Sequence, residues 1–463
     1  MASPRTTTLQ NSIANTRRQL AAKGHCHQCV SLAAAQVMAS PRRPLFKAST
    51  QALGCLFRGY THVPWGASYS YSASRRLYSS PATKPLRILF CGSDDVSAAS
   101  LQALCDEQNR HPSSIASIDV LCRPGKPYGR GLKKIREVPL VATAQGLGLR
   151  THMRDTFTGW ELPKVDGESI NLIIAVSFGL FVPPRVLNST EYDGLNLHLS
   201  LLPDLRGPSP VDYAILNGYK QTGVTLQTLS PKDFDHGKIL LQTPISIPEP
   251  DKITRGALHD ILVPISADLL IRGLREKVYL PQTTPVEPIL PESKILALAP
   301  KINTENKRLL SKMTAEEIVR KERAFGRVWV GAKLSDGSRK RVILEGLETV
   351  PMPTEMSDFY VTHEDKMGIF KPFTIVEDDG EKGGATTVPM MKAPDGNSII
   401  IAAKGDSALL IRNATIDGLK KNKAAVALYG KDLERGSDGS WLSGAGELIY
   451  WDAFSSIWHS VHH

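Results

Sequence analysis

Hydrophobic positions in the middle of the chain alternate between short continuous runs and helical spacings. The continuous runs, typical of buried strands, predict strands at residues 86–90, 118–121, 170–176, 195–199, 224–229 and 239–247. Apolar residues spaced by three and four predict helices at 96–104, 138–146 and 254–277, the first capped by Ser93 or Asp94. Strands that alternate with helices predict a doubly wound, Rossmann-like α/β domain over residues 85–280.

The pattern changes after residue 280. Five prolines between 281 and 300 predict a linker. A helix is predicted at 314–325, and short strands are predicted at 327–334, 340–350, 369–376, 398–403 and 408–411. Because no helices separate these strands, they predict a smaller, OB-like β-barrel in a carboxy-terminal domain of residues 301–463.

Charge sets residues 1–84 apart from the rest of the chain. The whole chain has 56 Lys and Arg against 46 Asp and Glu, a net charge of +10. Residues 1–84 hold 11 of the basic residues and no acidic one, so the remainder is nearly neutral. The excess is therefore no evidence for a nucleic-acid partner. A basic leader rich in Arg, Ser and Ala predicts mitochondrial targeting, to the matrix.

Residues 75–80 resemble a mitochondrial processing site, with cleavage after Tyr78. The alternative is a basic arm that stays attached and binds nucleic acid. Cys26 and Cys29 resemble half a zinc site, but no second Cys or His pair lies nearby. The cysteines after the leader are too sparse for a disulfide scaffold, and no apolar run has the ~20 residues of a membrane span. We expect no metal and no membrane partner.

The candidate chemistry lies in residues 194–210 and 234–237. Asn196 and His198 are two apart in a predicted strand, so their side chains leave the same face at its carboxyl end, where open α/β sheets bind ligands. Asp235 follows 37 residues after His198, beside a glycine two positions on. An amide, an imidazole and a carboxylate suit a tetrahedral acyl-type transition state. Ser200 lacks a Gly-x-Ser-x-Gly elbow and no Cys is adjacent, which favours direct attack by a substrate amine.

Each of these features alone also has a simpler interpretation. Asn-x-His in an apolar strand is often buried polar structure, and Asp235 could shape a turn. His198, Asp235, His236 and His259 could be metal ligands, but no ligand spacing links them.

Taken together, the pieces resemble the 10-formyltetrahydrofolate transferases. The pieces are Asn-x-His-x-Ser-Leu-Leu-Pro at 196–203, Arg-Gly-x-x-Pro at 206–210 and Asp-x-Gly at 235–237. Residues 123–134 and 177–183 are similar to the inserted tRNA loop and the folate-pocket segment of the methionyl-tRNA formyltransferase branch. The resemblance covers residues 85–280 well, and 411–426 look like the end of that family's barrel.

The resemblance implies transfer of a formyl group from 10-formyltetrahydrofolate to the amino group of initiator methionyl-tRNA, for mitochondrial translation initiation. It implies that Asn196 donates to the formyl oxygen, that His198 handles the proton of the attacking amine, and that Asp235 orients His198. The implied folate-binding residues are Phe178, Gly179, Leu180, Val182, Ser200, Leu201, Leu202, Pro203 and Gly237. The implied tRNA-binding residues are Arg130, Lys133, Lys134 and Arg206. We expect a monomer.

Two local basic clusters fit this partner. Residues 123–136 hold six basic residues and no acidic one, and residues 301–341 hold 12 basic and 5 acidic residues. A solvated loop and a solvated helix face are the simpler interpretation, but beside the catalytic motif we favour tRNA phosphates. Two alternatives remain open. One keeps the chemistry with another acceptor (glycinamide ribonucleotide, a sugar amine or water). The other is an inactive RNA-binding relative, against which the intact Asn196, His198 and Asp235 argue.

Overall fold

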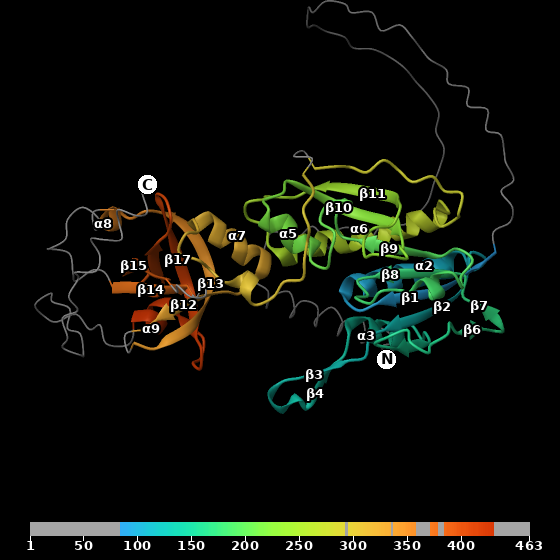
Figure 1. Cartoon of the computed structure of the whole chain (residues 1–463), viewed down its shortest axis with the longest axis horizontal. Helices are drawn as coiled ribbons and strands as arrows, with labels where there is room; N and C mark the ends of the chain where they lie inside the picture. The colour runs from blue at the N-terminus through green and yellow to red at the C-terminus, as the bar shows by residue number, and fades with distance from the viewer. Residues whose placement is uncertain (1–83, 292–294, 335–336, 358–370, 378–383, 430–463) are drawn as a thin grey trace, which may run out of the picture. The chain divides into compact units, whose positions relative to one another are not determined.

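The structure is a computed structural model that describes residues 84–291, 295–334, 337–357, 371–377 and 384–429 (Figure 1). The basic leader, the Cys26 and Cys29 pair and residues 430–463 lie outside this part. No helix among the described residues is long and apolar enough to cross a membrane. The described residues form an α/β region followed by an antiparallel barrel.

The α/β region is built on one sheet in the order β11-β10-β9-β8-β1-β2-β5. Its strands are β1 (Leu86–Gly92), β2 (Ile115–Cys122), β5 (Thr151–Met153), β8 (Leu172–Val176), β9 (Gly194–His198), β10 (Gln221–Thr228) and β11 (Ile239–Ser246). β5, β2, β1, β8 and β9 pair in parallel, whereas β10 is antiparallel to both β9 and β11. The Rossmann-like α/β class is thus confirmed, with two antiparallel strands at one edge.

Different helices and coil segments cover the two faces of this sheet. Helices α2 (Asp95–Arg110), α3 (Pro139–Gly146) and α6 (Arg255–Arg275) contribute to one core, together with the apolar runs of the strands. The other core contains the short helix α4 (Pro184–Leu187) and the aromatic residues Phe157, Trp160 and Phe178 from coil segments. The sequence pattern missed α4 and helix α5 (Pro210–Leu216). Asp94 caps α2, since its carboxylate accepts from the Ser97 amide.

The basic loop at 123–136 folds into a hairpin. β3 (Lys126–Tyr128) pairs antiparallel with β4 (Lys134–Arg136), and a 3₁₀ turn, η1 (Arg130–Leu132), joins them. The hairpin extends away from the sheet (Figure 1). A second small hairpin joins β6 (Lys164–Val165) to β7 (Glu168–Ser169). The sequence analysis predicted neither hairpin, because their short strands contain charged residues and show no alternation of apolar and polar positions.

The carboxy-terminal region forms a closed antiparallel barrel, as predicted. Its strands are β12 (Val328–Lys333), β13 (Arg339–Pro351), β14 (Lys371–Glu377), β15 (Gly384–Lys392), β16 (Ile399–Ala402) and β17 (Ser407–Ile416), with β18 (Asn422–Lys423) added to β17. Pairing of β13 with β17 closes the sheet. The remaining elements are η2 (Glu305–Lys307), α7 (Ala315–Phe325), α8 (Thr354–Ser357) and α9 (Ala424–Tyr429). Helix α7 gives Ile318 to the barrel core and Phe325 to a core of the α/β region.

Candidate active site

Asn196 and His198 lie on β9, next to the point where the sheet changes from parallel to antiparallel. In the register, Asn196 lies opposite Ala175 of β8 and Gln227 of β10. The side chains of Asn196 and His198 leave the same face because they are two residues apart. His198 is only 8% exposed, so its ring is held by protein atoms.

The chain turns back directly after β9 and brings a backbone carbonyl to His198. Leu205 and Gly207 both have left-handed backbone conformations, with φ of 56° and 122°. The turn places the Leu205 carbonyl oxygen 3.0 Å from His198 Nε2. A Cβ atom at position 207 would lie 2.4 Å from the Ala299 carbonyl oxygen, so only glycine fits there.

Asp235 lies in the loop after β10 and reaches both strand residues. Its Oδ1 is 3.4 Å from His198 Nδ1 and accepts from Asn196 Nδ2 at 3.3 Å. Gln227 Nε2 donates to the same oxygen at 3.4 Å, and the Gly207 amide donates to Oδ2 at 3.0 Å. The structure therefore brings together the three residues predicted as catalytic.

Both ring nitrogens of His198 face hydrogen-bond acceptors. Nδ1 faces the Asp235 carboxylate and Nε2 faces the Leu205 carbonyl, and both of these groups are acceptors. A neutral imidazole has one N–H and can donate to one of them, whereas an imidazolium donates to both.

Gln227 is a site residue that the sequence analysis missed. Its amide nitrogen donates to Asp235, and its Oε1 accepts from the Gly237 amide at 3.0 Å. A Cβ at position 237 would lie 1.7 Å from the Thr228 carbonyl oxygen, which explains the glycine after the aspartate. Gln227 is 1% exposed and follows the buried Leu226 in β10. A buried glutamine in a strand was the available signal, because such a group needs polar partners.

The three residues line a cavity of about 510 Å³. Among the predicted folate-binding residues, Phe178, Gly179, Leu180 and Val182 also line it. Ser200, Leu201, Leu202, Pro203 and Gly237 are not among the described residues that line it. Ser200 is instead 1% exposed and donates to the Asp204 carbonyl oxygen at 2.7 Å. The Ser200 hydroxyl therefore stabilises the turn after β9 and does not line the cavity.

The cavity wall includes groups that the sequence analysis did not single out. Phe181 and Phe234 meet edge to face, with ring centroids 5.5 Å apart. Phe234 is 58% exposed, so one aromatic face is open to a ligand. Burial raises the pKa of the Asp94 carboxyl, which also lines the cavity.

The predicted tRNA-binding residues separate into two places. Lys133 and Lys134 are exposed on the hairpin, which begins its 3₁₀ turn at Arg130. Arg136 of the same hairpin lies over the Tyr128 ring, 4.9 Å from its centroid. Arg206 is elsewhere, since its Nε donates to the Asp235 carbonyl oxygen at 3.0 Å. In this structure Arg206 helps to hold the loop that carries Asp235.

The described residues offer no thiolate and no metal cluster. Burial raises the pKa of the Cys105 and Cys122 thiols to about 11 and raises that of Cys91 further. No group of three or more His, Cys, Asp or Glu in the described part could hold a metal ion.

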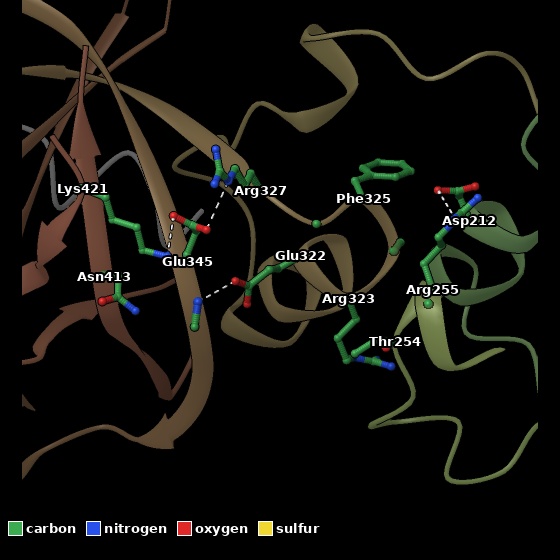
Figure 2. Close-up of a pocket in the computed structure, with 14 residues that line it drawn as sticks. Asp212, Thr254, Arg255, Glu322, Arg323, Phe325, Arg327, Glu345, Asn413 and Lys421 are labelled. Atoms are coloured by element: carbon green, nitrogen blue, oxygen red, sulfur yellow. Dashed lines mark hydrogen bonds and ion pairs between the residues drawn. The ribbon is translucent and has the colours of Figure 1, made fainter. Parts of the chain in front are cut away.

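A second cavity, of about 790 Å³, has residues of α6, α7 and the barrel in its wall (Figure 2). Several of its charged groups form ion pairs with one another. Glu345 pairs with Arg327 at 3.2 Å and with Lys421 at 3.1 Å. Arg255 pairs with Asp212 at 3.8 Å. These pairs connect the elements around the cavity.

Comparison with known proteins identifies the family. Residues 86–260 match the formyl transferase domain model. The mitochondrial methionyl-tRNA formyltransferase of Saccharomyces cerevisiae is 32% identical over 285 residues, which cover 54% of this chain and 70% of the yeast protein. The methionyl-tRNA formyltransferase of Bacillus velezensis is 28% identical over 352 residues, covering 76% of this chain and 96% of that protein.

Among solved structures, the chain is similar to the sugar 3N-formyl transferase WlaRD, with a TM-score of 0.42 and 15% identity over 71% of this chain and 98% of that one. The range matched by the domain model includes Asn196, His198 and Asp235. This chain belongs to the methionyl-tRNA formyltransferase family.

Proposed function

We propose that this chain transfers the formyl group of 10-formyltetrahydrofolate to the amino group of initiator methionyl-tRNA in the mitochondrial matrix. The observation that carries the proposal is the meeting of Asn196, His198 and Asp235 within 3.4 Å at a cavity wall. The relatives named for this activity support it, and one of them is mitochondrial.

In this mechanism the methionyl amine attacks the formyl carbon, and negative charge develops on the formyl oxygen. Asn196 Nδ2 donates to that oxygen, which stabilises the charge in a site largely shielded from water. His198 takes the proton that the amine nitrogen releases, and Asp235 stabilises the resulting imidazolium. The bond from the formyl carbon to the folate nitrogen then breaks, and that nitrogen takes up the proton that His198 received.

The folate is proposed to lie against Phe178, Gly179, Leu180 and Val182, which line the cavity beside Asn196. The exposed Phe234 ring offers an aromatic face for a pterin or aminobenzoyl ring. One chain carries the complete constellation, which supports activity as a monomer. The acid-free leader supports import into mitochondria.

An acceptor assay tests the proposal. The purified chain is mixed with labelled 10-formyltetrahydrofolate and one of four acceptors: methionyl-tRNA, uncharged tRNA, glycinamide ribonucleotide or water alone. We expect label only on the amine of methionyl-tRNA. Label on glycinamide ribonucleotide, or release of formate alone at the same rate, would contradict the proposed acceptor. No turnover with any acceptor would favour an inactive RNA-binding protein.

A further inference from the structure

A segment about 90 residues further along the chain lies against the turn that follows β9. Residues 297–299, here named the strap, lie in parallel with residues 205–209 and form a short β-bridge at Arg206 and Leu298. The Leu205 amide donates to the Ala297 carbonyl at 2.8 Å, and the Ala299 amide donates to the Arg206 carbonyl at 2.8 Å. A segment that its prolines predicted to be a spacer is therefore fixed to the turn.

The buried side chain of Asp204 binds the strap. It is 4% exposed, and its Oδ1 accepts from the Ala297 amide at 2.7 Å. Tyr219 forms a second hydrogen bond to the Asp204 carboxylate, and burial together with this bond raises the pKa of Tyr219 to about 12. A buried carboxylate is stable only where donors meet it, so Asp204 requires the strap to be in place.

The other side of the same turn holds the catalytic groups. The Leu205 carbonyl accepts from His198 Nε2, and the Gly207 amide donates to Asp235 Oδ2. The left-handed conformation of Leu205 is costly for a free loop and persists only when surrounding contacts hold it. The strap supplies those contacts, because its hydrogen bonds fall on Leu205 and Arg206 themselves.

We propose that Asp204, acting through the strap, is a positioning residue for His198 and Asp235. This inference rests on the proposed function, since it assigns Asp204 a part in formyl transfer. Asp204 does not line the catalytic cavity. It fixes the strap, the strap fixes the turn, and the turn presents one acceptor to His198 and one donor to Asp235.

The test compares Asp204→Ala, Asp204→Asn and Asn171→Ala. Asn171 is the matched control, being 3% exposed with an Oδ1 that accepts from the Arg87 amide at 2.7 Å, at the opposite end of β8 from the site. Asp204→Ala should lower kcat at least tenfold, with KM for methionyl-tRNA and folate within about twofold of wild type. Asp204→Asn keeps an oxygen for the Ala297 amide and should restore most of kcat. Asn171→Ala should lose thermal stability without losing kcat.

A second measurement does not depend on turnover. The ring nitrogen signals of His198, assigned by comparison with His198→Gln, should shift or broaden in Asp204→Ala and return in Asp204→Asn. Ala297→Pro removes the strap's donor without changing Asp204, so it should move the same signals. Unmoved His198 signals in both variants, or a kcat equal to that of the control, would overturn the proposal. Failure of wild type to formylate methionyl-tRNA, with the His198 signals still responding, would overturn the proposed function alone.

Discussion

Asp235 is held by more donors than its partner histidine provides. Amide groups of Asn196, Gln227 and Gly207 all donate to its two oxygens, and His198 Nδ1 lies 3.4 Å away. A carboxylate with this many fixed donors keeps its orientation when His198 changes protonation. Asn196 can serve both groups, since its amide nitrogen has two N–H donors and only one of them contacts Asp235.

We expect Asn196→Ala to lower kcat by about 10²–10³, or about 2.7–4 kcal/mol, because the developing negative charge loses its donor. Folate binding should change little, since the apolar wall of the cavity remains. Steady-state kinetics with methionyl-tRNA and a folate titration measure the two effects. A variant with the wild-type kcat would assign Asn196 to structure alone.

Asp235→Asn keeps the size of the side chain but removes its charge, and its amide nitrogen would meet donors that now face the carboxylate. We expect a large loss of kcat and an altered acid limb of the kcat–pH profile, because His198 loses the group that orients its ring. Circular dichroism should report an intact fold. An unchanged pH profile would remove Asp235 from the mechanism.

The site residues differ in how readily the sequence predicts them. Asn196 and His198 follow from the two-residue period of a strand, and Asp235 follows from a resemblance in order and interval. Gln227 and Asp204 cannot be found in this way. Gln227 acts across the register of two strands, and Asp204 acts on a segment 93 residues away. Hydrogen bonds between distant segments leave no local pattern.

Among the strands, the buried ones of the α/β sheet are predicted from their continuous apolar runs, whereas several short or polar strands are missed. β15 (Gly384–Lys392) is missed because it carries Thr386, Thr387 and an internal Pro389 in place of an apolar run. β15 is a strand because it pairs with β14 and β16 in the closed barrel, and its own sequence carries no pattern that predicts this. The strap falls within the predicted linker for a related reason, since its bonds are made by backbone groups and leave no side-chain pattern.

An ion pair of the buried Glu107 joins helices α2 and α6. Arg275 Nη2 lies 2.6 Å from Glu107 Oε2, and this hydrogen bond, opposed in part by burial, holds the pKa of Glu107 below its ordinary value. A carboxyl with a depressed pKa in the folded state stabilises the fold at pH values above its unfolded pKa. That contribution is lost as the pH falls through the folded pKa.

We therefore expect Glu107→Gln to lower the free energy of unfolding by about 1.5–3 kcal/mol at neutral pH. The difference between variant and wild type should shrink as the pH falls below the ordinary glutamate value of 4.5. Urea unfolding followed over that pH range measures it. A difference that stays constant with pH would assign the effect to packing and not to the ion pair.

At the scale of the whole molecule, the net charge says little about the binding partner. The positions of the exposed basic residues say more. The formal excess of +10 lies in residues 1–84, nearly all of them outside the described part, while the rest of the chain is nearly neutral. Much of the basic segment at 301–341 is engaged within the protein. Arg308 and Arg341 lie over the Trp329 ring, and Arg327 pairs with Glu345.

Lys133 and Lys134 are different, since both are exposed on a hairpin that extends from the sheet (Figure 1). We expect the double variant Lys133→Ala, Lys134→Ala to lower kcat/KM for methionyl-tRNA. The dependence of log kcat/KM on log salt should become shallower by about two units, since each lysine that no longer binds a phosphate removes about one. Folate binding should stay at wild type, because Asn196, His198 and the cavity wall are unchanged.

The double variant Lys164→Ala, Lys252→Ala is the matched control. It makes the same change of charge at exposed positions outside the β3–β4 hairpin. It should leave the salt slope and kcat/KM near wild type. If folate binding and tRNA turnover fall together in the hairpin variant, the hairpin belongs to the folate site or to the fold. If the two double variants behave alike, the hairpin is a solvated loop. The tRNA phosphates would then have to bind elsewhere, and the basic segment at 301–341 would be the next surface to vary.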